Sequence, residues 1–128
     1  MSVENSKKVL EHYFSSDDDN AFAEDVVFTI MGTGEEHRGA QAVRQMLDAF
    51  YRVAFTGSVE PRNMVYGEQG AVGEWDFVGT HRGTFDGIPA TGKQVRVPLV
   101  VSYDIVGEQI KRARVYLDRA VMRQQLTG

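Results

Sequence analysis

The sequence contains no cysteine, and this one absence removes several classes of protein. Without thiols there is no disulfide scaffold, no thiol nucleophile, no zinc finger and no iron–sulfur cluster. No apolar run approaches the roughly 18–20 residues that a membrane-spanning helix requires. The opening residues, MSVENSKKVLEHYF, lack the apolar core of a signal peptide. We therefore expect a soluble, cytoplasmic protein that does not enter a membrane.

Basic residues are fewer than acidic residues. Lys and Arg number 14 against 18 Asp and Glu, which gives a net charge of −4. Binding to nucleic acid or to an anionic membrane needs a positive field, so we expect neither partner. The G-x-S-x-G elbow, the phosphate-binding loop and the G-x-G-x-x-G fingerprint are missing. His12, His37 and His81 fall in separate predicted elements, so we expect no metal site.

What is present suits one compact domain that spans residues 1–128. The chain is 42% hydrophobic, which is enough for a single core. Valine occurs 17 times and leucine 5 times, and valine favours the half-buried surface of a sheet. Apolar residues at helical spacing predict helices over 2–14 and 40–54. The polar run 15–20 predicts a solvated turn, and a short helical turn is expected over 21–24.

Extended segments make up most of the remaining chain. The stretches 26–31 and 35–38 flank Gly-Thr-Gly and predict a hairpin. Four longer extended segments follow, separated mainly by short glycine-containing turns: 57–66, 71–84, 93–106 and 109–117. Helices followed by an antiparallel meander predict an α+β fold, with the helices packed on one face of the sheet.

Alternation along these segments indicates which face points inward. The odd positions of 71–84 include Trp75, Phe77 and His81, and the odd positions from 95 to 105 are all apolar or aromatic. In the last segment the odd face holds Ala113, Val115 and Leu117. The even face holds Arg112, Arg114 and Tyr116, and leads to Asp118. Alternation alone therefore directs the odd face inward and Asp118 outward.

Two residues could carry acid–base chemistry. A carboxylate drawn into an apolar cavity has a raised pKa and can exchange a proton with a carbon acid, which makes Asp118 a candidate. His81, on the Trp75 and Phe77 face, is a second. The residues equally allow Asp118 to be a solvated strand end paired with a neighbouring arginine. His81, Trp75 and Phe77 could likewise be ordinary core side chains.

Two stretches resemble the SnoaL-like polyketide cyclases of the NTF2-like superfamily. Residues 79–93, GTHRGTFDGIPATGK, are similar to a family stretch that begins G-T-H-x-G and ends G-I-P-x-T-G-(K/R). Residues 115–118, VYLD, followed by QQLTG at 124–128, are similar to the family's closing motif. The order of the predicted elements agrees with that fold along almost the whole chain.

This resemblance implies a cone-shaped barrel in which a strongly bent, mostly antiparallel sheet wraps around N-terminal helices and leaves an apolar cavity. It also implies a homodimer or higher oligomer formed through the outer sheet face. It directs the even face of 109–117 inward with Asp118, and a second subunit would then cover Ala113, Val115 and Leu117.

The resemblance further implies an enzyme without metal or cofactor that acts on a hydrophobic, polycyclic small molecule. Asp118 would be the general acid and base of an aldol-type closure, with His81 as its catalytic partner. His81, Tyr116 or Tyr13 could donate a hydrogen bond to the enolate oxygen. The residues expected to bind substrate are Tyr13, Phe50, Trp75, Phe77, Tyr103, Arg114 and Tyr116.

Three other functions stay open. An isomerase of this fold would need a second acid or tyrosine in the cavity, for which Tyr13 is available. An epoxide hydrolase would need an Asp–Arg–Asp arrangement, and the sequence shows no convincing second aspartate. A non-catalytic domain could bind a small molecule in the same cavity without any proton-transfer residue.

Overall fold

The computed structural model describes residues 2–15 and 19–128, so residues 16–18 of the turn predicted over 15–20 lie outside the described residues. The α-helices are α1 (Val3–Ser15), α2 (Ala40–Asp48) and α3 (Arg119–Thr127). Within the described ranges, none of them is long and apolar enough to cross a membrane.

Six strands form one sheet with the order β2-β1-β6-β5-β4-β3. Neighbouring strands are antiparallel except for β1 and β6, which are parallel. The strands are β1 (Phe22–Ile30), β2 (Glu35–Arg38), β3 (Phe55–Tyr66), β4 (Gly70–His81), β5 (Gln94–Val106) and β6 (Gln109–Leu117). The α+β fold with a curved, mostly antiparallel sheet is thereby confirmed.

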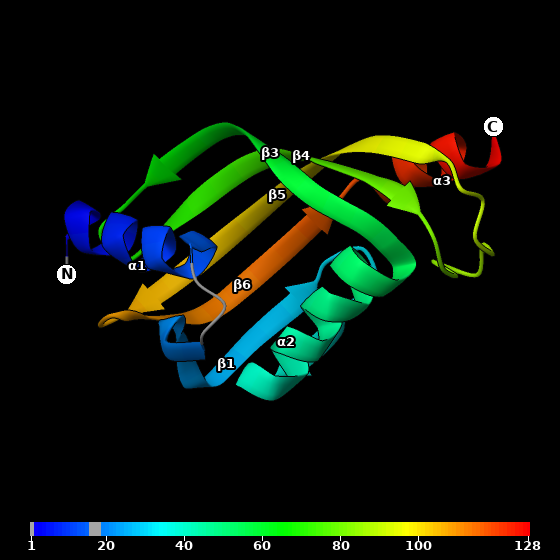
Figure 1. Ribbon diagram of the computed structural model, residues 1–128. Coiled ribbons are helices and arrows are strands. Elements are labelled where there is room, and N and C mark those ends of the chain that lie inside the picture. Colours follow the sequence, from blue (N-terminus) through cyan, green and yellow to red (C-terminus); the bar gives the residue numbers. More distant parts are fainter. Residues whose placement is uncertain (1, 16–18) are drawn as a thin grey trace.

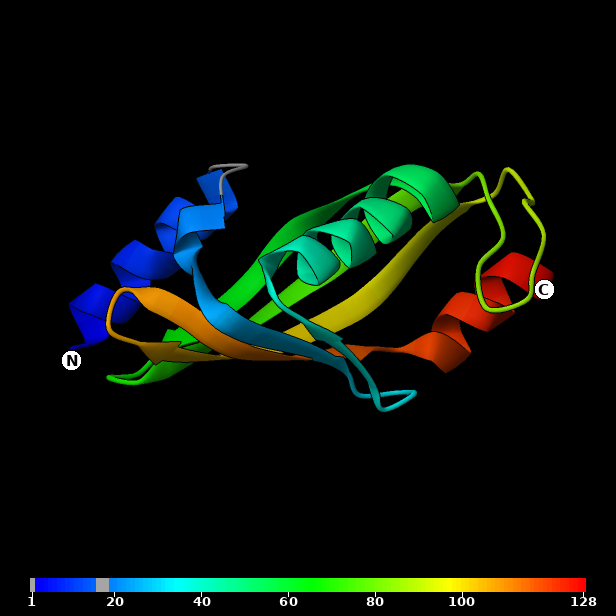
Figure 2. The same ribbon diagram turned by 90° about the horizontal axis from the view of Figure 1, so that it is seen from below.

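The sheet is bent, and α1 and α2 lie on the same side of it (Figures 1 and 2). Val9 and Leu10 of α1 are buried in the larger core cluster, and α1 contacts β3 and β4 at one end of the sheet (Figure 1). Met122 and Leu126 of α3 are buried in a second cluster beyond the far end of β6. Helices α1 and α3 thus lie at opposite ends of the sheet. Helix α2 and residues 49–54, which follow it, cover the sheet between them (Figure 1).

Three local predictions need correction. The helical turn expected over 21–24 is instead a 3-10 turn, η1 (Asp19–Ala21), and β1 begins at Phe22 because that side chain is buried opposite Ile110 of β6. The second half of the helix predicted over 40–54 is a π-helix, η2 (Ala49–Ala54). Helix α3 was not expected at all.

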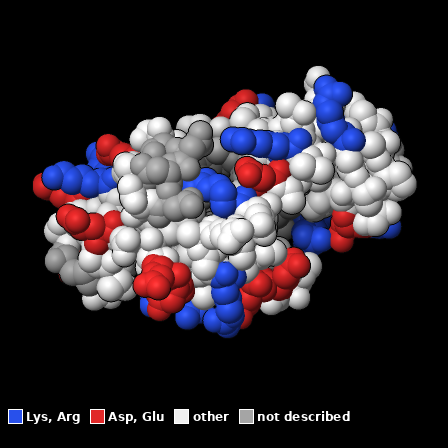
Figure 3. Space-filling view, turned by 60° about the horizontal axis from the view of Figure 1, so that its bottom comes forward, with Lys and Arg blue, Asp and Glu red and all other residues white. Residues whose placement is uncertain are grey.

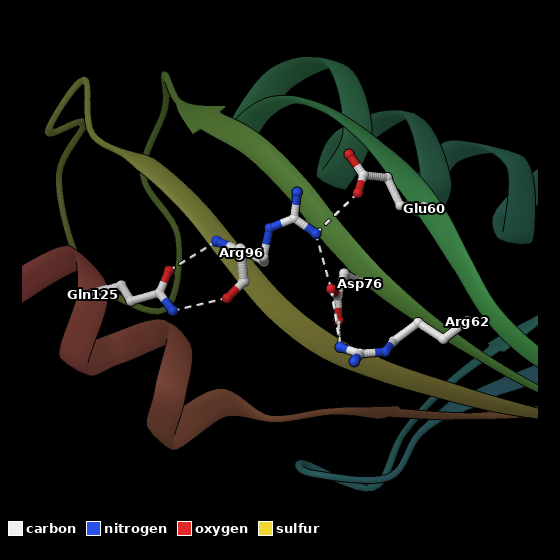
Figure 4. Close-up of polar contacts among 5 residues, drawn as sticks. All are labelled: Glu60, Arg62, Asp76, Arg96 and Gln125. Atoms are coloured by element: carbon white, nitrogen blue, oxygen red, sulfur yellow. Dashed lines mark hydrogen bonds and ion pairs between the residues drawn. The ribbon is translucent and has the colours of Figure 1, made fainter.

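A charged network occupies the outer face of the sheet (Figure 4). Asp76 is 6% exposed because Arg62 and Arg96 cover its carboxylate, with N···O distances of 2.9–3.1 Å. Hydrogen bonds from Arg62, and then from Arg96, hold the pKa of Asp76 below its ordinary value. Gln125 of α3 bonds both backbone groups of Arg96 at 2.8 Å, which fastens α3 to β5.

Candidate functional site

A cavity of about 730 Å³ lies between the inner face of the sheet and the helices. The sheet contributes apolar side chains from five strands, including Phe28, Val59, Trp75, Leu99 and Val115. Figure 3 shows acidic and basic side chains interspersed over one face of the molecule, without a single dominant sign. The part of the cavity wall that these strands form is therefore mostly apolar, and the polar side chains of the wall lie at a few other positions.

Four of the residues expected to bind substrate line this cavity: Tyr13, Phe50, Trp75 and Tyr103. The ring of Tyr13 lies 6.1 Å from that of Tyr103 in an edge-on contact. The structure thus brings together an aromatic residue from α1, one from η2 and two from the sheet.

Three tyrosines contribute to the cavity wall: Tyr103 is buried, and Tyr13 and Tyr51 are half-buried. Burial raises the pKa of Tyr13 to about 12, although the nearby Arg44 guanidinium opposes this. Burial raises the pKa of Tyr51 and Tyr103 as well, and the negative charge of an ionised neighbouring phenol in this group would raise it further. The three phenols therefore lie close enough to interact, and they stay protonated as hydrogen-bond donors at neutral pH.

The inward face of β6 differs from what the family resemblance implied. Val115 pairs with Val101 and Leu117 with Leu99, and directly opposed residues share a face of a sheet. Since Val101 and Leu99 line the cavity, Val115 and Leu117 line it too. The odd face is inward, as alternation alone predicted, so these residues are not covered by a second subunit.

Arg114 and Tyr116 consequently lie on the outer face, away from the cavity. Arg114 makes a two-pronged ion pair with Asp104, at 3.1 and 3.2 Å, and that partner raises its pKa. Tyr116 is 46% exposed. Neither side chain is among the residues that line the cavity, so the expectation that they contact a ligand inside it is corrected.

Asp118 occupies the junction between β6 and α3. Its side chain is exposed and accepts a hydrogen bond from the backbone N–H of Val121 at 3.1 Å, so it is the N-cap of α3. It does not line the cavity. The placement of Asp118 inside an apolar enclosure is therefore wrong, and its geometry fits a helix cap.

His81 and Phe77 are fully buried but do not line the cavity. The backbone N–H of Thr91 donates to Nδ1 of His81 at 3.2 Å, and the Thr91 hydroxyl lies 3.0 Å from the same nitrogen. His81 thus anchors the loop after β4. Phe77 packs its ring 4.6 Å from that of Phe50, behind the cavity wall.

Sequence reasoning missed several polar residues of the wall. Tyr51 was part of the predicted apolar helix face but was not recognised as a site residue. The others lie on β2, on α2, in the loop after β4 and at the start of α3: Glu35, His37, Arg44, Asp86 and Arg119. The hairpin register would have revealed Glu35 and His37, because they lie opposite Ile30 and Phe28. The described residues hold no cluster of three histidine, aspartate or glutamate side chains suited to a metal ion.

Solved structures resemble this fold over nearly its whole length. TsrD from Streptomyces laurentii is 18% identical with a TM-score of 0.81, covering 99% of this chain and 98% of its own. An NTF2-like protein from Burkholderia xenovorans LB400 is 16% identical with a TM-score of 0.78, covering 99% of each chain. At these identities the likeness establishes the fold. A comparison with curated proteins finds no significant match.

The family is established by the sequence itself. A model of the SnoaL-like polyketide cyclases matches residues 7–126, which include every strand and all the residues that line the cavity. The chain therefore belongs to the SnoaL-like polyketide cyclase family.

Proposed function

We propose that the protein binds a hydrophobic small molecule in this cavity and catalyses proton transfer at a carbon next to a carbonyl group, without a cofactor. The observation that carries the proposal is that one buried tyrosine, Tyr103, and two half-buried ones, Tyr13 and Tyr51, line the same cavity beside apolar side chains of the sheet. A phenol that stays protonated can donate to a carbonyl oxygen and more strongly to the enolate that forms from it.

The size of the cavity supports a ligand of several rings. Its volume of about 730 Å³ falls within the roughly 300–1,000 Å³ of sites that enclose small molecules. Trp75 and Leu99 offer flat and branched apolar surfaces. Such walls exclude water, and a hydrogen bond to a developing oxyanion is worth more where water is excluded.

Asp118 has no part in this proposal. Its carboxylate caps α3 and is exposed, so it lacks the apolar surroundings that a carboxylate needs in order to act in proton transfer. An aldol-type ring closure stays within the proposal, because the same enolate is its first intermediate. The proton acceptor must then be another residue.

The test uses β-tetralone, a fused bicyclic ketone, as the probe. Trp75 is the only tryptophan and lines the cavity, so its fluorescence reports binding. Proton transfer is measured by mass spectrometry, as deuterium uptake at the carbon next to the carbonyl in deuterium oxide. We expect uptake well above the buffer rate, and a loss of roughly tenfold or more in Tyr103→Phe.

The matched control is Tyr116→Phe, which removes a phenol from the outer face and should exchange like the parent. If β-tetralone binds but gains deuterium only at the buffer rate, the cavity is a binding site and the enzymatic part of the proposal is wrong. If Tyr103→Phe exchanges as fast as the parent, the phenols do not stabilise the enolate.

We also propose that the protein self-associates through the outer face of the sheet. Val72 and Tyr116 are 42% and 46% exposed there, between charged side chains whose partners lie on the same face. Light scattering should give a mass of at least two chains for the parent and a lower mass for a Val72→Lys, Tyr116→Lys double variant. A single-chain mass for the parent would refute this proposal.

A further inference from the structure

His37 lines the cavity, and the function proposed above gives it no role. It lies on β2, the edge strand, opposite Phe28 of β1 in the hairpin register. Phe28 and His37 both line the cavity, as do Ile30 and the residue opposite it, Glu35. The short strand therefore presents an imidazole and a carboxylate to the same cavity, at a position where the Glu35 side chain is 63% exposed.

The His37 side chain is partly shielded and closely associated with Glu35. It is 22% exposed, and Nε2 lies 3.5 Å from Oε1 of Glu35. Nε2 is shielded from solvent and makes no hydrogen bond with the described residues, so its 3.5 Å approach to Glu35 is a charge contact only. Assigning the proton to Nε2, the nitrogen nearest this carboxylate, leaves the lone pair on Nδ1.

The other acidic groups on the cavity wall are paired differently. Asp86 lies 2.8 Å from Arg119, and Asp48 lies 3.7 Å from Arg52. These two carboxylates are engaged with guanidinium groups, whereas a neutral imidazole keeps a lone pair that can accept a proton. Among the described residues that line the cavity, His37 is the only imidazole.

We infer that His37 is the catalytic proton acceptor of the reaction proposed above, and that Glu35 is the residue that positions it. This inference rests on the proposed function, and it identifies the proton acceptor that the proposed function left unassigned. The lone pair of Nδ1 takes the proton from the carbon next to the carbonyl. The electrons of the C–H bond form a C=C bond, and the carbonyl π electrons move to oxygen. A tyrosine phenol donates a hydrogen bond to the resulting enolate.

Glu35 has a defined part in this step. Its negative charge stabilises the imidazolium that forms when Nδ1 gains the proton. The same proton returns from Nδ1 to carbon when the step reverses, so no further reactant is consumed. Because the His37 side chain is partly exposed, the captured proton can exchange with solvent first, and deuterium then enters the substrate.

The experiment follows deuterium uptake by β-tetralone in the full-length parent, His37→Gln and His12→Gln. We expect His37→Gln to lose roughly 100-fold or more of the exchange rate, with the Trp75 fluorescence titration unchanged. His12 is exposed on α1 and does not line the cavity, so His12→Gln is the matched control and should retain the parent rate.

A second pair of measurements separates catalysis from folding. In His37→Ala, added imidazole should restore exchange in proportion to its concentration, which a purely structural defect would not allow. Glu35→Gln should lower kcat and leave KM unchanged, because the carboxylate acts on the imidazole and not on the substrate.

The outcomes distinguish the two proposals. If the parent exchanges and His37→Gln exchanges within a few-fold of it, the role of His37 is refuted while the proposed function stands. Failure of imidazole to rescue a folded, probe-binding His37→Ala variant refutes it as well. If the parent itself does not accelerate exchange, the proposed function fails, and the assignment of His37 fails with it.

Discussion

The carboxylate of Asp118 has one visible task, which is to receive the backbone N–H of Val121 in the first turn of α3. Removing an N-cap leaves that donor without its partner and typically costs about 1 kcal/mol. We therefore expect Asp118→Ala to lower the free energy of unfolding by about 1 kcal/mol, measured by urea denaturation. Asp118→Ser should come close to the parent, because serine is also a good N-cap.

The serine variant also separates capping from catalysis, since it keeps the cap and removes the carboxylate. Deuterium uptake by β-tetralone should be the same in Asp118→Ser and in the parent. If Asp118→Ser is stable but loses most of its exchange activity, Asp118 takes part in proton transfer and the cap is not its only role.

Single residues show where sequence reasoning succeeds and where it fails. Trp75 and Tyr103 were predicted to face the cavity because long strands alternate strictly, and that period can be read from the sequence alone. Arg114 and Asp118 were misplaced because the resemblance overrode the same alternation. Their direction is fixed by pairing with β5, which joins positions distant in sequence.

At the scale of elements, a pair of glycines shapes the sheet beneath the cavity. Gly57 of β3 lies directly opposite Gly79 of β4, and the ring of Phe77 lies over them. A Cβ at Gly57 would lie 2.5 Å from Cε1 of that ring. Gly57→Ala must displace the ring, so we expect a loss of about 1–3 kcal/mol of stability, as for other overpacked cores.

Urea denaturation of Gly57→Ala beside Gly67→Ala measures this effect. A Cβ at Gly67 would meet only the carbonyl oxygen of Gly70, at 3.7 Å, so that variant should match the parent. Equal stability of the two variants would mean that Phe77 moves aside without cost and that the glycine pair is not required.

The remaining elements differ in whether the local sequence could have predicted them. Helix α3 could have been found, because Asp118 is a favoured N-cap residue and Gly128 follows the last helical residue. The π-helix η2 could not, since residues 49–54 keep the apolar spacing of an α-helix and give no sign of the wider turn. Strand β1 extends back to Phe22 because β6 buries that side chain, a contact the local sequence does not contain.

At the scale of the whole molecule, the fold was predictable and the active-site chemistry was not. Helical and strand periods place the helices against one face of a sheet, and that arrangement alone encloses apolar side chains. The polar groups of the cavity wall come from α1, α2, η2, α3, β2, β5 and the loop after β4, so only the assembled molecule brings them together. Tyr51 and His37, for example, looked like ordinary helix and hairpin residues in the sequence.

Because folding shields the phenols of the cavity wall from water, the free energy of unfolding depends on pH in alkaline solution. Burial raises the pKa of Tyr13, Tyr51 and Tyr103 above the value of 10.0 that a free phenol has. The folded state therefore keeps its phenolic protons above pH 10, whereas the unfolded chain loses them. Stability is fully present below pH 10 and falls as the pH rises above it, by about 1.4 kcal/mol per pH unit for each buried phenol.

Tyr103→Phe removes one of these phenols, so its free energy of unfolding should fall less steeply with pH. Between pH 10 and 11, the slope should be shallower than that of the parent by about 1 kcal/mol per pH unit, and the difference should approach about 1.4 kcal/mol per pH unit at higher pH, measured by urea denaturation at closely spaced pH values. Tyr116→Phe is the control, because its phenol lies outside the cavity and is 46% exposed, so its loss should keep the parent slope. If Tyr103→Phe keeps the parent slope too, Tyr103 ionises in the folded protein as it does in the unfolded chain. The cavity would then be open to water, and a phenol in it would not be the strong donor that the proposed proton transfer requires.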